Sequence, residues 1–178
     1  MDVLTIFGLQ FFLSLVLFGL LARWFLTPWL TQKTQSQALF WLTLPHATRY
    51  LGLVFLVPGV VSQSLPNSFA AAAAYGDLAA GVLALLALIA LRTRWAGATA
   101  LVWIFNIVGT VDLLNALSHA DAVPHLGAAW YIPTFWVPVL LVTHFMIFGR
   151  LFRKSDQARG PSTTTVQERE VPLAKGAS

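Results

Sequence analysis

The sequence contains no cysteine, which excludes disulfide bonds, thiolate metal sites and cysteine nucleophiles. Charge is also scarce, because 11 basic and 7 acidic residues make up only 10% of the chain, and half of them lie at or after Arg150. The sequence also lacks a nucleophile elbow, an HExxH motif, a P-loop and a Rossmann glycine pattern. These absences assign no reaction, and they favour a protein that is not an enzyme.

Apolar residues dominate what remains. Hydrophobic residues make up 57% of the chain and the mean hydropathy is +0.72, values typical of a polytopic membrane protein. A helix needs roughly 20 apolar residues to cross about 30 Å of hydrocarbon. Segments of this length predict an all-α bundle with five transmembrane spans, at 3–26, 38–61, 68–91, 96–117 and 129–152. Pro45 leaves two possibilities open for 38–61, one continuous span or an interfacial helix followed by a short span.

Basic residues lie at every second connection between the predicted spans. They flank the first and third connections and follow the last span, whereas the second and fourth connections have none; the first four are Arg23, Lys33, Arg92 and Arg94. The positive-inside rule then predicts an N-terminus outside and a C-terminus in the cytoplasm, in a bacterial-type inner (plasma) membrane. This topology explains the net charge of +4 without a nucleic-acid partner. Residues 153–178 are polar and lack apolar periodicity, which predicts a disordered cytoplasmic tail.

Six polar side chains lie at similar depths in four of the predicted spans. At about 1.5 Å per residue they lie roughly 12 to 24 Å from the cytoplasmic ends of their spans. They are His46, Arg49, Asp77, Asn106, Asp112 and His144. An unpaired charge at such depth costs about 3 kcal/mol or more, and pairing inside a bundle relieves this cost. We therefore expect Arg49 to pair with Asp77 or Asp112, in a polar core able to bind a ligand.

Asp77 lies among small residues that allow another helix to approach closely, as in other membrane interfaces. These residues are Ala73, Ala74, Ala80, Gly81 and Ala84. We therefore expect Asp77 to face protein and not lipid. His46 lies three residues before Arg49 and shares its helix face. We expect Arg49 to carry the charge that faces an anionic group of a ligand, with Asp77 holding it in place and His46 lining the same site.

Two histidines share a depth on different spans. His46 and His144 have the arrangement that bis-histidine ligation of a b-type haem requires. The alternative is a pair of hydrogen-bonded interior histidines, because the neutral imidazole is the natural form in a low dielectric. The sequence leaves this choice open. It predicts no metal site, because His119, Asp121 and His125 in the outer connection lack the spacing typical of zinc ligands.

Two stretches between Arg49 and Asp112, "RYLGLVFLVPG" and "YGDLAAGVLALLALIALRTRWAGATAL", are joined by a short loop that contains Pro66. Over about a third of the chain this pattern resembles the small DoxX-like membrane proteins. The resemblance implies a multi-helix bundle with an arginine near the start of one span and a Gly-acid motif opening the next, so that Arg49 and Asp77 form a shared polar core. Glu is more usual in that family at the position of Asp77. Some of its members are associated with quinone-linked sulfur oxidation, and many have no known activity.

Three functions remain open at this point. In the first, the polar core binds a small amphiphilic ligand (a quinone, a haem or a lipid-like molecule), or the chain is an accessory subunit of a membrane complex. In the second, the chain is a structural or assembly protein whose Arg-Asp pair only fixes helix packing. In the third, it is a small proton-coupled transporter. The implied partners are the lipid bilayer and either another membrane protein or a second copy of the chain.

Overall fold

The computed structural model describes residues 1–158, and within this range it is all-helical, without a β-strand. Four helical stretches are long and apolar enough to cross a membrane, namely Val3–Thr31, Asn67–Arg92, Ala98–Leu117 and Gly127–Arg153. They correspond to the predicted spans at 3–26, 68–91, 96–117 and 129–152. The predicted all-α class is therefore confirmed, together with these four apolar helices.

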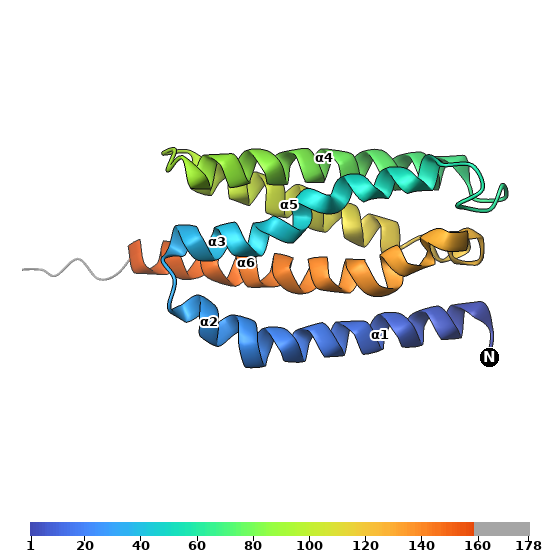
Figure 1. Cartoon of the computed structure of the whole chain (residues 1–178), viewed down its shortest axis with the longest axis horizontal. Coiled ribbons are helices and arrows are strands. Elements are labelled where there is room, and N and C mark those ends of the chain that lie inside the picture. Colours follow the sequence, from blue (N-terminus) through green and yellow to red (C-terminus); the bar gives the residue numbers. More distant parts are fainter. Residues whose placement is uncertain (159–178) are drawn as a thin grey trace, which may run out of the picture.

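The remaining predicted span, 38–61, is not one α-helix. The α-helix α3 (Gln35–Thr43) ends just before Pro45, and a 3₁₀-helix, η2 (Leu44–Leu56), continues from it. Proline has no backbone N–H and its ring clashes with the carbonyl four residues earlier, so an α-helix breaks there. The two elements together still run from one end of the bundle to the other (Figure 1). The structure thus shows a change of helix type next to Pro45, whereas the choice between one span and an interfacial helix with a short span stays a prediction.

The 3₁₀ geometry of η2 aligns its buried residues on a single face. His46, Arg49, Gly52 and Phe55 are buried, and each lies three residues after the one before. A 3₁₀-helix has 3.0 residues per turn, so side chains at this spacing eclipse one another. In an α-helix, nine residues correspond to two and a half turns, and Phe55 would point about 180° away from His46. The three-residue period of the buried side chains therefore fits the observed 3₁₀-helix and not an α-helix.

This face of η2 packs along α4 (Asn67–Arg92) more extensively than along any other element. The facing side of α4 consists of small residues, among which Ala74, Ala80, Gly81 and Ala84 are buried. A Cβ atom at Gly81 would lie only 3.3 Å from the backbone nitrogen of Tyr50. The small-residue face predicted around Asp77 is therefore confirmed, and the element that approaches it is η2.

Two π-helical turns precede prolines. The first long helix consists of α1 (Val3–Leu21), the π-helical η1 (Ala22–Leu26) and α2 (Thr27–Thr31), and Pro28 is the second residue of α2. In the last long helix, the π-helical η5 (Ile132–Trp136) leads into α6 (Val137–Ala158), and Pro138 is the second residue of α6. A π turn widens the backbone spacing and thereby accommodates a proline ring without ending the helix.

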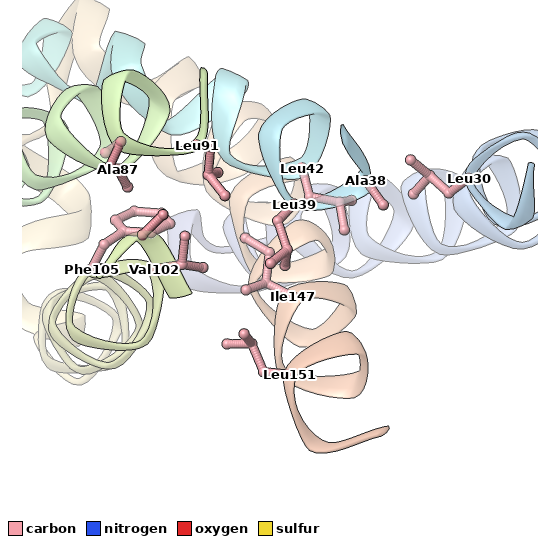
Figure 2. Packing of buried hydrophobic residues seen from close by; sticks show 13 residues of the cluster. Leu30, Ala38, Leu39, Leu42, Ala87, Leu91, Val102, Phe105, Ile147 and Leu151 are labelled. Atoms are coloured by element: carbon pink, nitrogen blue, oxygen red, sulfur yellow. The ribbon is translucent and has the colours of Figure 1, made fainter. Parts of the chain in front are cut away.

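Apolar clusters lie on both sides of the buried polar residues. One cluster joins α2, α3, α4, α5 (Ala98–Leu117) and α6; Figure 2 shows Leu39, Leu91, Phe105 and Ile147 converging within it. A second cluster includes Phe55, Phe69 and Ala74 together with residues of the 3₁₀ turns η3 (Ala120–His125) and η4 (Gly127–Trp130). Along η2, α4 and α5 the polar residues lie between members of these clusters, so the bundle has a polar layer within an apolar interior.

α1 lies at the edge of the bundle. None of its residues is buried, and it packs on α6, η5 and η3. Asp2 caps its N-terminus by accepting a hydrogen bond of 2.7 Å from the Thr5 amide, and this backbone hydrogen bond lowers the pKa of Asp2 from its ordinary value of 3.8. At the other terminus, α6 includes residues 153–158 of the predicted tail, whereas residues 159–178 lie outside the described part of the chain.

The connections between helices fall at two ends of the bundle (Figure 1). One end holds the α2–α3 and α4–α5 connections and the end of α6, where Arg92, Arg94 and Arg153 lie; we call it the basic end. The other holds the N-terminus, the connection 57–66, η3 and η4; we call it the loop end. Neither 57–66 nor 118–131 contains lysine or arginine.

Candidate functional site: a polar cluster around Arg49

The Arg49 side chain lies at the centre of the polar layer and is held by three acceptors. Its Nε donates to Asp77 Oδ1 on α4 at 2.7 Å, and its Nη1 donates to the Gly109 carbonyl on α5 at 2.9 Å. Its Nη2 donates to Asp112 Oδ2, also on α5. The guanidinium group therefore joins η2, α4 and α5, which is the fork-like binding that arginine performs and lysine does not.

The charges in this cluster do not balance. When all three side chains are ionised, two carboxylates surround one guanidinium group and leave one surplus negative charge. The negative groups are also the more exposed ones. The Arg49 side chain is 0% exposed, whereas those of Asp77 and Asp112 are 13% and 15% exposed. The expected role of Arg49 as the group that faces an anion stays a prediction; in this structure the Arg49 side chain is buried among its acceptors. The two aspartate side chains are the more accessible members of this ionic group.

His144 and Asn106 form the next part of the layer. His144 Nδ1 lies 2.7 Å from Asn106 Oδ1, and Asn106 Nδ2 donates to the His144 carbonyl at 3.3 Å. Because an amide oxygen only accepts hydrogen bonds, His144 carries its ring proton on Nδ1. Its Nε2 has no hydrogen-bond partner within the described residues and faces the Arg49 side of the cluster, since a Cβ at Gly109 would lie 3.0 Å from it and 2.9 Å from Arg49 Nη1.

His46 on η2 also uses one ring nitrogen for a hydrogen bond to the protein. Its Nε2 lies 2.9 Å from the Thr143 hydroxyl oxygen, which in turn donates to a backbone carbonyl in its own helix. His46 Nδ1 is buried and, within residues 1–158, has no hydrogen-bond partner. The two imidazole rings lie 4.1 Å apart between centroids, and both contact Phe105. Each ring thus keeps one nitrogen available as a buried acceptor.

This packing does not fit a b-type haem between the two histidines. Axial ligands lie on opposite faces of the macrocycle and point one nitrogen each at the iron. Here the ring centroids of His46 and His144 lie only 4.1 Å apart, which leaves no room for a macrocycle between the two rings. The interior hydrogen-bonded pair is the arrangement that the structure contains. Among residues 1–158 no group of three His, Asp or Glu side chains is placed to hold a metal ion.

Glycines make room for the cluster at three points. A Cβ atom on Gly52 would overlap the Asp77 carboxylate, and one on Gly76 would overlap the Asp112 carboxylate. A Cβ atom on Gly109 would lie 2.8 Å from the His144 ring and 2.9 Å from Arg49 Nη1. Real Cβ atoms do not approach so closely, so each glycine is required for the buried charges to meet.

A narrow cavity of about 110 Å³ reaches both carboxylates from the loop end. Apart from Asp77, Asp112 and His119, its lining is apolar, and it includes Phe7 of α1, Phe55 of η2 and Phe69 of α4. A second cavity of about 190 Å³ touches Asp77 and Arg49 beside Trp136, whose indole nitrogen donates to Thr48 at 3.2 Å. The carboxylates are therefore the polar end of an otherwise apolar recess.

The structure brings together all six residues predicted to form the polar core. Arg49, Asp77 and Asp112 form one ionic group; Asn106, His144 and His46 continue from it toward the basic end. Sequence reasoning missed the three glycines, Thr143 and the contribution of Phe7. The sequence did contain a signal for Gly52. It lies three residues after Arg49, just as His46 lies three residues before Arg49.

Comparison with known proteins gives one family. A family model described as a domain of unknown function, DUF8737, matches residues 6–152, which is most of the chain and includes every residue of the cluster. No curated protein matches the chain, and no solved structure does. The resemblance to DoxX-like proteins stays a prediction.

Proposed function

We propose that the chain, which belongs to the DUF8737 family, is an integral membrane protein that binds a small amphiphilic ligand at Asp77 and Asp112. The observation that carries this proposal is the exposure of two carboxylates, and not of their arginine, to an apolar cavity. A surplus negative charge in low dielectric favours a ligand whose polar end is a cation or a hydrogen-bond donor.

The cavity limits the size of that polar end. Its volume of about 110 Å³ is well below the roughly 300–1,000 Å³ of pockets that enclose a whole drug-sized ligand. The site therefore takes a head group, and the apolar part of the ligand lies along Leu4 and Phe7 of α1, which also line the cavity. Ionised carboxylates accept hydrogen bonds and do not donate them. A hydroquinone or a cationic lipid-like head group satisfies them, whereas an oxidised quinone offers acceptors only.

Native mass spectrometry of the detergent-released protein tests the proposal, with Asp112→Asn as the informative variant. This change removes the surplus charge while leaving the Arg49–Asp77 pair intact, so we expect a folded protein that loses a stoichiometric small molecule retained by the wild type. Asp121→Asn is the matched control, because Asp121 is exposed in η3 and does not line the cavity. Asp77→Asn should impair both folding yield and ligand retention.

A wild-type protein without bound small molecule, or an Asp112→Asn variant that retains it fully, would refute ligand binding at the carboxylates. A bare chain that holds only another protein would favour the structural or assembly role, or that of an accessory subunit. In that case the Arg-Asp pair acts by fixing the packing of η2 on α4.

Proton-coupled transport is the second candidate function. It is supported by the two carboxylates of Asp77 and Asp112, which lie together in the bundle interior and line a cavity that reaches them from the loop end. Transport requires water to reach the carboxylates. Because the chain has no cysteine, a single Ala73→Cys substitution at the cavity wall reports this access without background. Absence of labelling by a water-soluble maleimide in the folded protein would rule this candidate out.

The proposed topology places the loop end outside the cell and the basic end on the cytoplasmic side of the plasma (inner) membrane. It is supported by the collection of arginines at one end of the bundle and their absence from the connections at the other. Single cysteines at the exposed positions Ser64 and Thr93 test it in intact cells. A membrane-impermeant maleimide should label Ser64→Cys and not Thr93→Cys; the reverse pattern contradicts the topology.

A further inference from the structure

The basic end contains a much larger cavity than the one at the carboxylates. Its volume is about 680 Å³, and it lies between the start of α3 and the α4–α5 turn. Arg92 and Arg94 line it, and no acidic residue does. Neither arginine side chain has a salt bridge or a hydrogen bond within the described residues. The cavity is therefore open, large and positively charged, which distinguishes it from the carboxylate site.

The depth of this cavity corresponds to the membrane interface. Trp41 and Trp95 both line it and both are exposed. Tryptophan is enriched at the level of the lipid head groups, because its ring is apolar and its N–H is polar. The hydroxyl groups of Thr34 and Thr99 lie in the same lining and can donate hydrogen bonds. The cavity thus combines two cations, two hydroxyl donors and an aromatic rim at head-group depth.

The backbone of Arg94 adds a further observation. Its φ angle is +56°, and it is the one non-glycine residue with positive φ among those described. This left-handed conformation is unfavourable for a residue with a long side chain and needs to be stabilised by its surroundings. The Trp95 amide, which donates to the Ala90 carbonyl at 3.0 Å, closes the turn around it. This turn ends α4 directly after Arg92.

We propose that this cavity binds the phosphate group of one anionic phospholipid of the surrounding leaflet, with Arg92 and Arg94 as its ligands and Trp41 and Trp95 beside the glycerol region. Arginine guanidinium groups bind phosphate oxygens with good geometry. Basic residues at the cytoplasmic surface attract anionic lipids, at about 1 kcal/mol for each residue. This inference concerns a different site from the ligand cavity and does not depend on it.

The test is native mass spectrometry of the full-length protein in mixed micelles that contain either phosphatidylglycerol or phosphatidylcholine. We expect the wild type to retain one phosphatidylglycerol molecule and no phosphatidylcholine. The double variant Arg92→Gln/Arg94→Asn should weaken this binding roughly thirtyfold, the fold-change that corresponds to two arginines at the cytoplasmic surface. Asparagine tolerates the left-handed conformation, so the turn is preserved.

Arg153→Gln is the matched control, because Arg153 is exposed at the same end and does not line the cavity. It should leave lipid retention unchanged. Equal retention of both lipids, retention by the double variant, or an equal loss in Arg153→Gln would each overturn the proposal. Displacement of phosphatidylglycerol by millimolar inorganic phosphate would show that the phosphate itself is the ligand, and would overturn its assignment to a lipid. Should the double variant not fold, thermal stability of the wild type decides, since only phosphatidylglycerol should raise it.

Discussion

Substituting alanine for Gly76 tests whether the buried ionic cluster depends on the space that this glycine provides. The new Cβ atom would overlap the Asp112 carboxylate, which must then move away from Arg49. In a helix, Gly→Ala by itself stabilises by about 1 kcal/mol. Overpacking costs about 1–3 kcal/mol, and a weakened hydrogen bond between charged groups costs about 1.5–3 kcal/mol. The free energy of unfolding should therefore fall by about 1.5–5 kcal/mol.

The control is the same substitution at Gly149, also in an α-helix, where a Cβ atom would meet nothing within 4 Å. It should stabilise by about 0.5–1 kcal/mol. The assay is unfolding by SDS in mixed micelles, followed by tryptophan fluorescence. A double-mutant cycle locates the cause, because Gly76→Ala should no longer destabilise when Asp112 is already alanine. The reasoning is refuted when both glycine variants change stability in the same direction, or when the cycle shows no coupling.

Three further predictions use the same structure. Arg49→Lys should lower the free energy of unfolding by about 3–5 kcal/mol, since a single ammonium cannot reproduce the three-way contact; wild-type unfolding in SDS would contradict this. Asn106→Leu should cost about 1–3 kcal/mol, because it leaves the His144 Nδ1 proton without its acceptor, and equal stability would argue against that tautomer. The first turn of α1 should lose amide protection in hydrogen exchange as pH falls. The Thr5 amide lowers the pKa of Asp2 in the folded state, so the stabilisation is complete above 3.8 and is lost as pH falls through the folded pKa; protection that is independent of pH would contradict this capping role.

The composition of the polar layer could be predicted because spanning helices run nearly parallel. Under that condition, residue counts convert to depth, and side chains at one depth on different helices come together. This argument grouped Arg49 with Asp77 and Asp112, and the alanines around Asp77 identified the face of α4 that packs on protein. Burial and pairing of charge are thus accessible from the sequence of a membrane protein.

The chemistry of the site was not accessible in the same way. Depth does not determine that Arg49 lies between two carboxylates and is itself more deeply buried than either of them. Nor does it determine how His46 and His144 orient their rings, since that depends on Asn106 and Thr143 in other helices. The three-residue spacing of His46, Arg49, Gly52 and Phe55 could have predicted the 3₁₀ conformation of η2, but transmembrane spans are ordinarily interpreted with the α-helical period.

The 3₁₀ conformation of η2 also determines how the chain responds to changes in its length. At about 1.5 Å per α-helical residue and about 2.0 Å per 3₁₀ residue, α3 and η2 together extend about 40 Å, close to the length of α4, although they contain four fewer residues. Inserting one residue into η2 would turn every following side chain by about 120° and move Arg49 or Gly52 off the α4 face. Inserting three residues would restore the direction but shift the contacts by about 6 Å, so that Gly52 no longer lies over Asp77. A change in the length of η2 is therefore incompatible with its packing on α4.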